Sequence, residues 1–419
     1  MIEYIVVCHV NMKSTKLPFL TALKKRLFMH KKLVSFVKYN RLFLFLYRVF
    51  GNFMLLILRL FVRVKDNRVL FMSFGGQKFD DSPRALFDAM KADPFFADYE
   101  LVWGFTHPEK FSPDGAKKVK VDTLSFYKAA LSSRVWITNS SVQRGLKLKR
   151  RGIVEVNTWH GTPLKKLGDD FTGKTSLKKI KHDGTIYASQ SEYDREIFTR
   201  LFHTDKENIL LTDLPRNDAL LSYTDADKRS IKEALSIPFD KKVILYAPTF
   251  REYERDKLNA CYIKPPIDTA KWKESLGGEY VVLFRAHYEV INILGIQNDG
   301  FFFNVSDYPS LNDLMAVSDI LLSDYSSIYF DFSITEKPMF AFPYDYKTYL
   351  EKRGLYLMLE DVFPCGVFED EDALLAAFLS FDRVRYESVS RAFRERFAPY
   401  AGSASQKLLD ALKAALQNK

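Results

Sequence analysis

Short apolar segments alternate with helical segments along most of this 419-residue chain. From Arg68 onward, runs rich in Val, Ile, Leu and Phe are separated by stretches whose apolar residues recur at helical spacing. Such alternation predicts parallel sheets with helices on both faces. The predicted fold class is therefore α/β.

The alternation falls into two series joined by the charged segment Thr224–Lys232 and Pro238. The first series predicts helices at 83–91, 123–132 and 191–203 and strands at Val69–Phe74, Glu100–Phe105, Lys118–Val121, Val135–Thr138, Ile153–Thr158, Thr185–Ala188 and Ile209–Leu211. The second predicts helices near 310–317 and 326–334 and strands at Val243–Ala247, Tyr280–Phe284, Phe301–Asn304, Ile320–Leu322 and Met339–Phe342.

These two series predict two Rossmann-like domains, residues 66–225 and 240–400, that face each other across a cleft. The tail is helical by periodicity, and Gly402 separates a C-terminal helix over 401–419. In such sheets ligands bind at the carboxyl ends of the strands. Functional residues are therefore expected where strands end.

Residues 1–65 form a basic, apolar segment that precedes the two series. Between Tyr4 and Lys65 there are thirteen Lys and Arg and no Asp or Glu, although the whole chain carries a net charge of only +10. Arg48 and Arg59 interrupt the apolar run, so the uncharged part between them is too short to span a bilayer. The pattern predicts an amphipathic helical segment, with residues 13–65 lying in the cytoplasmic membrane interface.

An internal helical layer packed on the core is the alternative for this segment. Nucleic acid is not an expected partner, because the aromatic residues are mostly Phe among aliphatic residues and lack the spacing of a stacking platform. Cys8, Cys261 and Cys365 are far apart and odd in number, which favours a reducing compartment. No Asp/His metal triad is visible, so no obligatory bound metal or other cofactor is expected.

The run Asn157–Gly168 carries the strongest functional signal. His160 is suited to moving protons near neutral pH, and Gly161 permits close approach of the backbone to a ligand. Thr162 and a proline follow in a rigid turn, and Lys165 stands ready for an anionic group. This pattern predicts chemistry on a phosphate.

Strand ends in the second series supply further polar groups. They deliver Thr249 and Arg251, then Arg285 and His287, then Asp324, Ser326 and Ser327 at a helix start. Free backbone N–H groups and serine hydroxyls at that start would cradle a phosphate. Asp324 more plausibly caps the helix, orders the loop or accepts a substrate hydroxyl, since it would repel a phosphate.

Each of these groups also has a structural alternative. Arg251 and Arg285 are equally compatible with surface ion pairs, and His287 with a satisfied histidine at a sheet edge. Arg216 and Arg353 lie in rigid turns, Pro215–Asp218 and Lys352–Tyr356. Either of these two arginines would clamp a phosphate by two parallel hydrogen bonds or pair with a neighbouring carboxylate.

Taken together and in this order, the segments Trp159–Lys165, Pro215–Asp218, Ala247–Arg251, Arg285–His287, Ser323–Ser327 and Arg353–Tyr356 resemble the CDP-glycerol glycerophosphotransferase family of teichoic-acid primases and polymerases. The similarity covers about residues 68–400. It implies a GT-B-like fold and transfer of glycerol phosphate, or a related polyol phosphate, from a CDP-activated donor with release of CMP. The implied acceptor is a hydroxyl on an undecaprenyl-diphosphate-linked saccharide or growing teichoic-acid-like or capsular polymer at the cytoplasmic membrane face.

The resemblance also implies roles for individual residues. His160 and His287 match the family's two histidines implicated in catalysis, with His160 expected to be the general base. The expected acceptor-side residues are Gly161, Thr162 and Lys165, and the expected donor-binding residues are Thr249, Arg251, Arg285, Asp324, Ser326, Ser327, Arg216 and Arg353. Mg²⁺ bound to the donor is compatible with this set. Phe250 stands where the family often has tryptophan, and Leu214 where glycine is common.

Two other functions fit the same sequence. One is a glycosyltransferase of GT-B architecture that uses a nucleotide sugar, and the other is an inactive, membrane-peripheral binding protein. The presence of both His160 and His287 argues against an inactive binding protein.

Overall fold

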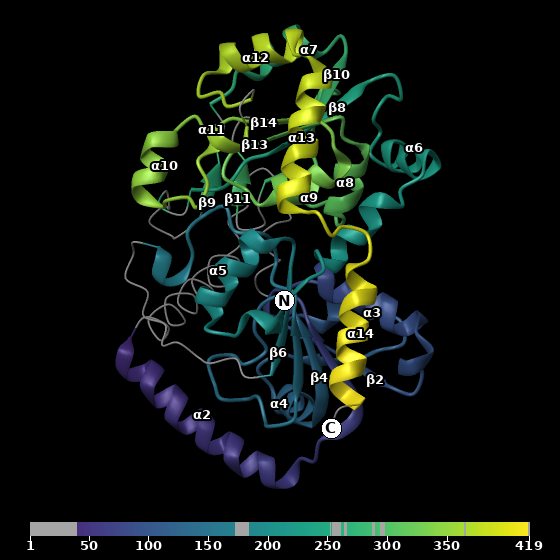
Figure 1. Ribbon diagram of the computed structural model, residues 1–419, viewed down its shortest axis with the longest axis vertical. Helices are drawn as coiled ribbons and strands as arrows, with labels where there is room; N and C mark the ends of the chain where they lie inside the picture. Colours follow the sequence, from purple (N-terminus) through teal and green to yellow (C-terminus); the bar gives the residue numbers. More distant parts are fainter. Residues whose placement is uncertain are drawn as a thin grey trace, which may run out of the picture. The chain divides into compact units, whose positions relative to one another are not determined.

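Two parallel sheets form the framework of the chain (Figure 1). The computed structural model describes residues 40–171, 184–251, 253, 261–263, 266–286, 290–293, 298–363 and 366–417. The first sheet has the strand order β3-β2-β1-β4-β5-β6-β7 and the second β12-β10-β8-β13-β14, while β9 and β11 pair separately. Most successive strands are joined through α or 3₁₀ helices, and the strands pair in parallel, so the predicted α/β class is confirmed.

The strands lie close to their predicted positions. They are Lys65–Met72 (β1), Glu100–Phe105 (β2), Lys117–Lys120 (β3), Ser133–Thr138 (β4), Val154–Asn157 (β5), Thr185–Ser189 (β6), Ile209–Leu211 (β7), Lys242–Ala247 (β8), Cys261–Ile263 (β9), Tyr280–Phe284 (β10), Val290–Ile293 (β11), Phe302–Asn304 (β12), Ile320–Ser323 (β13) and Met339–Ala341 (β14). Sequence patterns missed β9 and β11, which are short and lie outside the two main sheets.

The helices include several that the sequence did not predict. They are Arg41–Phe61 (α2), Asp81–Ala92 (α3), Leu124–Ser132 (α4), Glu192–Phe202 (α5), Asp225–Ala234 (α6), Thr269–Leu276 (α7), Leu311–Val317 (α8), Ile328–Phe332 (α9), Tyr346–Lys352 (α10), Leu359–Val362 (α11), Glu371–Ser380 (α12), Arg383–Phe397 (α13) and Ala404–Gln417 (α14). The predicted join at Thr224–Lys232 is mostly helix α6, which begins with a capping box between Thr224 and Asp227. The expected helical tail is confirmed.

The described chain divides into two compact units. Unit 1 contains the described residues up to Phe79 together with Phe96–Trp136 and Ser141–Ile153, and unit 2 contains Asp80–Phe95, Ile137–Ser140 and the described residues from Val154 onward. The domain limits expected from the sequence, 66–225 and 240–400, stay a prediction.

Helix α2 is attached to the rest of unit 1 along one face. Leu55 is buried in the same apolar cluster as Leu146, and Asn52 Oδ1 accepts a hydrogen bond from the Lys147 N–H at 2.8 Å. Tyr47 donates to the Arg144 carbonyl at 3.0 Å, and Arg59 donates to the Lys147 carbonyl at 2.6 Å. These contacts hold the helix lengthwise against the segment 144–147.

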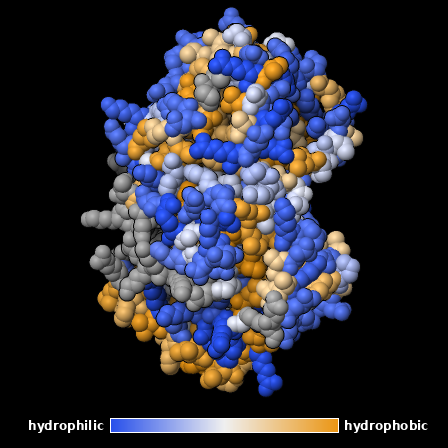
Figure 2. Space-filling model, viewed as in Figure 1, coloured by the Kyte–Doolittle hydropathy of each residue, from blue (hydrophilic) through white to orange (hydrophobic). Residues whose placement is uncertain are grey.

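The opposite face of α2 is apolar and exposed. Phe50, Phe53 and Leu60 keep 67%, 57% and 81% of their surface accessible, and Figure 2 shows apolar side chains gathered over this helix. The predicted alternative of an internal helical layer is therefore wrong for the described part of the segment. By length and composition, Leu42–Phe61 is long and apolar enough to cross a membrane, with a mean hydropathy of 1.7. Interruption by two arginines therefore does not by itself exclude a span.

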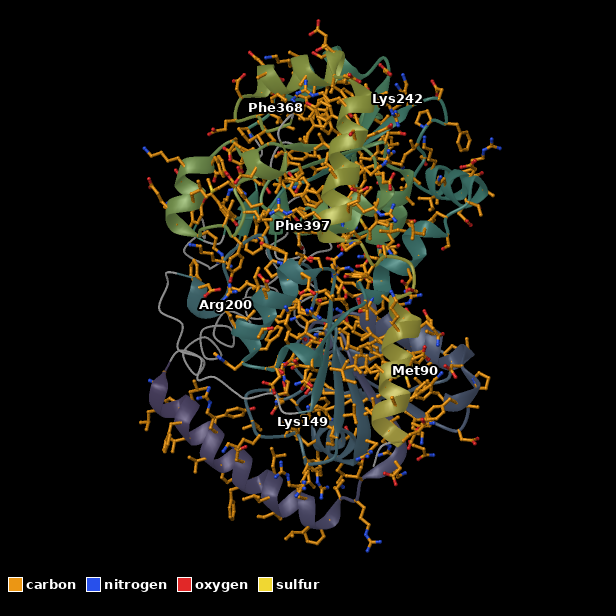
Figure 3. The ribbon with its side chains drawn as sticks, in the orientation of Figure 1. Met90, Lys149, Arg200, Lys242, Phe368 and Phe397 are labelled. Carbon is orange, nitrogen blue, oxygen red and sulfur yellow. The ribbon has the colours of Figure 1, made fainter. Side chains whose placement is uncertain are left out.

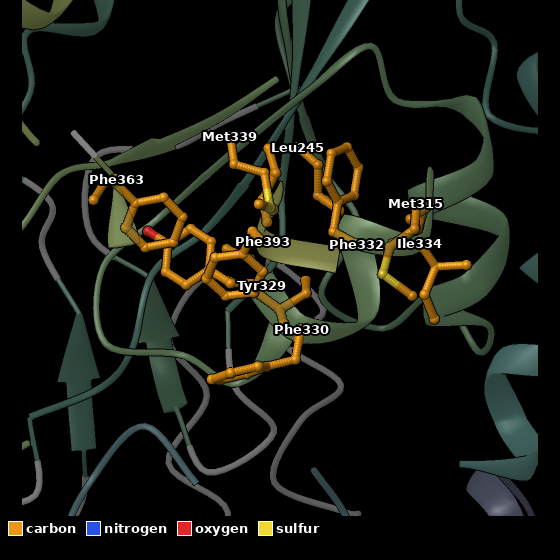
Figure 4. Packing of buried hydrophobic residues seen from close by; sticks show 14 of the residues in the cluster. Leu245, Met315, Tyr329, Phe330, Phe332, Ile334, Met339, Phe363 and Phe393 are labelled. Carbon is orange, nitrogen blue, oxygen red and sulfur yellow. The ribbon is translucent and has the colours of Figure 1, made fainter. Parts of the chain in front are cut away.

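In unit 2, helix α9 follows β13 and lies inside the apolar core. Tyr329, Phe330 and Phe332 are fully buried, and Figure 4 shows them among apolar side chains of β8, β14 and α13. The ring of Phe397, labelled in Figure 3, meets Phe330 edge-on at 5.4 Å. Because α9 is packed on all sides, the polar residues that it carries have fixed positions.

Candidate functional site

A sharp turn after β5 presents His160. The Thr158 N–H donates to the Thr138 carbonyl at 2.9 Å, which extends the sheet by one residue beyond the strand. Trp159 and Gly161 then adopt positive φ angles of 51° and 142°. The backbone therefore reverses on both sides of His160 and leaves the imidazole at the carboxyl end of β5, where α/β sheets bind ligands.

Two contacts set the orientation of the imidazole. Nδ1 of His160 lies 2.9 Å from the carbonyl oxygen of Asn139. A carbonyl only accepts hydrogen bonds, so Nδ1 carries the proton and the lone pair resides on Nε2. The indole of Trp159 stacks on the imidazole with the ring centroids 4.2 Å apart.

The surroundings of His160 keep it neutral. Dense protein around the ring disfavours the charged form and lowers its pKa below the ordinary value, and the positive charge of Arg216 adds to this effect. The hydrogen bond to Asn139 and the charge of Asp81 act in the opposite direction but do not outweigh burial. The residue nevertheless keeps an exposed surface, so a reactant can reach a neutral imidazole, the form that acts as a general base.

The His160 turn packs against the Ser-Ser sequence that precedes α9. A Cβ placed on Gly161 would lie 2.7 Å from Oγ of Ser327, closer than real Cβ atoms approach other atoms. Only glycine therefore fits, both for this contact and for its positive φ. The segments that contain His160 and Ser327 were both predicted to belong to the site. This contact brings them together, although they lie far apart in the sequence.

Arg216 is partly buried and lies against the same turn. Its Nη1 lies 2.6 Å from Oδ2 of Asp81 and 3.2 Å from the His160 carbonyl oxygen, and its Nη2 lies 2.7 Å from Oδ2 of Asp331. Burial alone would lower the pKa of this guanidinium, but the charges of Asp331 and Asp81 outweigh burial and raise it. Of the two predicted alternatives for Arg216, phosphate clamp or ion pair, the structure shows the ion pair.

Thr162 holds the turn from the other side. Its buried hydroxyl lies 2.7 Å from Oε1 of Gln190 and 3.2 Å from Oδ2 of Asp194. Asp194 also accepts from the backbone N–H groups of Gln190 and Ser191 at the start of α5. Burial raises the pKa of Asp194 to about 6 in spite of these bonds. The arrangement indicates that Thr162 supports the loop, and its predicted contact with an acceptor stays a prediction.

A second buried carboxylate, Asp213, lies next to this network. Its Oδ1 accepts from Gln190 at 2.9 Å and from Asn217 at 3.1 Å, and Asn217 also donates to Asp331 at 2.9 Å. Burial raises the pKa of Asp213 to about 7, and the negative charge of Asp331 contributes to the rise.

Arg251 and Asp324 form the centre of a separate buried cluster. Asp324 lies 2.9 Å from Nη1 of Arg251 and accepts from the backbone N–H groups of Thr249 and Tyr325. Asp345 receives two further hydrogen bonds from the guanidinium, at 2.7 and 2.8 Å. Asp324 thus orders the loop, as one of its predicted alternatives stated. The surface ion pair considered for Arg251 is wrong, because the pair is buried.

Arg285 differs from these arginines in its partners. Its Nη1 donates to the carbonyl oxygens of Val305 and Tyr308, at 3.2 and 2.8 Å. No carboxylate of the described residues lies within ion-pair distance, and burial lowers the pKa of the guanidinium, while Asp80 and Asp307 act weakly against the shift. A partly buried cation without an adjacent counter-ion is suited to bind an anion.

The turn around Gly354 is joined to the segment that follows the His160 turn. Lys165 forms an antiparallel bridge with Leu355, the Lys166 N–H donates to the Gly354 carbonyl at 3.2 Å, and Arg353 donates to the Lys166 carbonyl. In the structure, the segment Arg353–Leu355 therefore holds Lys165 and Lys166, which follow the His160 turn, in place. Contacts of Lys165 and Arg353 with ligand stay predictions.

Some predicted site residues are described only in part or lie outside the described residues. His287 lies outside them. Ser326 is half-buried, and its Oγ accepts from the Ile328 N–H at 3.3 Å. Oγ1 of Thr249 is buried with no hydrogen-bond partner among the described residues.

Within the part of the chain that the structure describes, no group of His, Cys, Asp or Glu is placed to hold a metal ion, and the metal prediction stays open.

The sequence patterns missed the supports of the histidine. Asn139, Asp81 and Asp331 lie on three other segments of the chain, and each contacts His160 or its arginine. Asn139 follows a predicted strand directly, so the rule that drew attention to other strand ends applies to it too. Nothing in the local sequence marks Asp331 inside an otherwise apolar helix as the partner of Arg216.

A parallel-sheet α/β protein with a histidine at a strand end and arginines close to it is compatible with the class of phosphate-handling transferases that the sequence suggested. The sequence profile of the CDP-Glycerol:Poly(glycerophosphate) glycerophosphotransferase family matches residues 53–413. The chain belongs to this family.

Relatives and solved structures agree with this assignment. The chain is 32% identical over 366 residues to a teichoic acid poly(glycerol phosphate) polymerase of Staphylococcus epidermidis, covering 83% of this chain but only 50% of that protein. It is 31% identical to a teichoic acid glycerol-phosphate transferase of Staphylococcus aureus, covering 82% of this chain and 92% of the relative. The structure of the wall teichoic acid polymerase TagF superposes with a TM-score of 0.74 at 31% identity, covering 85% of this chain and 90% of that one. The GT-B-like fold is thereby confirmed.

Replacing Gly161 by alanine tests the contact with Ser327. We expect Gly161→Ala to lower both the free energy of unfolding and turnover, since the added Cβ clashes with Ser327 Oγ and positive φ costs an L-residue about 1–2 kcal/mol. Gly300→Ala is the matched control, because Gly300 has a φ of +85° but open space around the added atom. Equal loss of stability and turnover in both variants, measured by denaturant unfolding and product release, would contradict the proposed contact.

Replacing Asp213 by asparagine tests the raised pKa of this carboxyl. The folded chain retains the proton up to about pH 7, whereas the unfolded chain loses it near 3.8, so its contribution to stability is lost as pH rises between these values. Asp213→Asn carries no titrating group, so the unfolding free energy of the variant should improve relative to the parent over that interval. A difference between the two chains that does not change with pH would show that Asp213 is ionised throughout.

Proposed function

We propose that this chain transfers glycerol phosphate, or a related polyol phosphate, from a CDP-activated donor to a hydroxyl of a lipid-linked saccharide or growing teichoic-acid-like polymer. Membership of the glycerophosphotransferase family supports the reaction class. A TagF variant has been solved after a soak with CDPG, which supports the donor class. The acceptor is inferred from the names of the polymerase and transferase relatives.

The proposed reaction is a single displacement at phosphorus. The acceptor oxygen attacks the β-phosphorus of the donor, a new P–O bond forms, and the bond between the β-phosphorus and the bridging oxygen of CMP breaks. CMP leaves with the electron pair of that bond. The acceptor proton passes to Nε2 of His160, the nitrogen that carries the lone pair in the tautomer that the Asn139 carbonyl selects.

One observation carries this proposal: the turn that presents the oriented His160 packs against Ser327 through Gly161. The tautomer follows from the Asn139 carbonyl, and the closeness follows from the contact between Gly161 and Ser327. A general base and hydroxyl donors for a phosphate are therefore available at one place. Such positioning supplies much of the rate enhancement in phosphoryl transfer.

Electrostatic support for the donor diphosphate is assigned to Arg285. The described residues supply no carboxylate within ion-pair distance of Arg285, in contrast to Arg216 and Arg251. A bound diphosphate would supply the missing negative charge, and the guanidinium would stabilise charge that develops on leaving CMP. Ser326, Ser327 and Thr249 would contribute hydroxyls, and His287 keeps its predicted role beside the leaving group.

The site of action that we propose is the cytoplasmic face of the membrane. The exposed apolar face of α2 and the basic residues of the segment suit a peripheral position in the headgroup region. The contacts of its other face with segment 144–147 favour a helix lying on the bilayer over one that crosses it, because crossing would break them. An enzyme held there meets a lipid-linked acceptor within two dimensions.

Removal of the base tests the reaction. His160→Ala should reduce CMP release from CDP-glycerol on the order of a hundredfold or more with little change in donor binding, because a general base typically contributes that much. His107→Ala is the control, since that half-buried histidine pairs with Glu109 and belongs to unit 1. Near-normal turnover of His160→Ala would remove His160 from the mechanism.

A donor panel separates the proposed reaction from the alternatives. With the parent enzyme, CDP-glycerol or CDP-ribitol should be consumed and UDP-sugars should not. Consumption of a UDP-sugar alone would establish the glycosyltransferase alternative. Consumption of no donor at all, with donor binding retained, would favour the inactive binding protein.

Changing the outer face of α2 tests membrane association. The triple variant Phe50→Ser, Phe53→Ser and Leu60→Ser should lose co-sedimentation with vesicles of anionic phospholipid while keeping its thermal unfolding transition, because these side chains are exposed. The matched control changes Phe239, Leu379 and Val384 to serine, which are also exposed apolar residues but lie in unit 2. Unchanged co-sedimentation of the α2 variant would place the membrane contact elsewhere.

A further inference from the structure

The Arg216 side chain touches three separate segments of unit 2 besides its own. It contacts Asp81 at the start of α3, the carbonyl of His160 after β5, and Asp331 on α9, while it lies itself in the 3₁₀ turn Pro215–Leu221. The side chain is only 13% exposed, and its buried Nε has no hydrogen-bond partner among the described residues. Its two terminal nitrogens thus hold three groups from distant parts of the sequence.

We propose that Arg216 is a positioning residue for His160, which it holds through the backbone carbonyl, and that it does not clamp the donor. The proposal rests on the proposed function, in which His160 is the general base.

The charge balance around Arg216 argues against a donor clamp. One guanidinium faces two carboxylates, Asp81 and Asp331, at 2.6 and 2.7 Å. This group of three already has a net charge of −1 when all are ionised, as the lowered pKa of Asp81 indicates for that carboxyl. A phosphate would have to displace a carboxylate from a buried pair and add further negative charge, which is strongly unfavourable.

Helix α9 gives the arrangement its rigidity. Asp331 lies between Phe330 and Phe332, which are both fully buried, so its carboxylate has little freedom. The segment just before the same helix contributes Ser327, which packs on Gly161. The turn that carries His160 is therefore fixed to α9 at two points, directly through Gly161 and indirectly through Arg216.

The same groups affect the protonation of His160 in opposite directions. The positive charge of Arg216 lowers the pKa of the imidazole, whereas the negative charge of Asp81 raises it. The Asn139 carbonyl and the indole of Trp159 also face His160, and neither titrates in this pH range. Removal of Arg216 and removal of Asp81 should therefore shift the pKa in opposite senses.

Three variants of the full chain test the proposal: Arg216→Lys, Arg216→Gln and Asp81→Asn. In Arg216→Lys the charge remains, but one ammonium cannot replace the fork of two nitrogens, so kcat should fall roughly tenfold to a hundredfold with KM for CDP-glycerol nearly unchanged. In the pH profile of kcat/KM, the acidic limb reports the pKa of the base. It should move to higher pH in Arg216→Gln and to lower pH in Asp81→Asn. Arg394→Gln is the control, because it removes an arginine that pairs with Glu336, away from His160.

Two results would overturn the proposal. A raised KM for CDP-glycerol with kcat retained in Arg216→Lys would make Arg216 a donor clamp, and acidic limbs that do not separate in Arg216→Gln and Asp81→Asn would make it purely structural. If Arg216→Gln does not fold, as judged by circular dichroism, Asp81→Asn and Arg216→Lys decide alone. His160→Ala, assayed in parallel, separates the two levels: its full activity refutes the base role of His160 in the proposed function, whereas its inactivity together with unshifted limbs refutes only the positioning role of Arg216.

Discussion

The ion pairs between Arg216 and the carboxylates of Asp81 and Asp331 are the interaction on which the candidate site depends. Burying a guanidinium and two carboxylates is unfavourable unless each is closely paired, and the net stability gained from such pairs is small. Losing one partner is far more damaging, because it leaves a buried charge uncompensated. An ion pair of this kind therefore adds little to the overall stability of the fold. It does fix the relative positions of α3, the His160 turn and α9, because moving any one of them would break its contact with Arg216.

The arginines of unit 2 show how partners decide a role. Arg251 is surrounded by two carboxylates and by the rings of Tyr325 and Tyr344, with its guanidinium carbon 4.9 and 4.6 Å from the ring centroids. Arg285 has carbonyl partners instead. Carbonyl groups orient a guanidinium without neutralising it, so its charge remains available to an anion. The same residue type thus builds the framework in one case and provides an attractive charge in the other.

Much of the fold could be predicted from sequence, because buried parallel strands are short, apolar and regularly spaced. Strand ends also marked His160, Thr249 and Arg285 as candidates, since topology brings such ends to one edge of a sheet. Partner choice could not be predicted. Asp331 is 115 residues from Arg216 in sequence, and no local pattern shows that these two side chains meet. For this reason every arginine near a strand end was expected to bind ligand, although the structure gives Arg216 and Arg251 buried carboxylate partners.

The environment of His160 reconciles two opposing requirements of a general base. A higher pKa would make the imidazole a stronger base but would leave more of it protonated and inactive near neutral pH. Burial lowers the pKa and keeps the ring neutral, while the Asn139 carbonyl and the Asp81 carboxylate favour the imidazolium that forms once the proton is taken. Arg216 limits the influence of Asp81, because its guanidinium lies against that carboxylate at 2.6 Å. The balance between burial and this one ion pair therefore sets how readily the histidine accepts a proton.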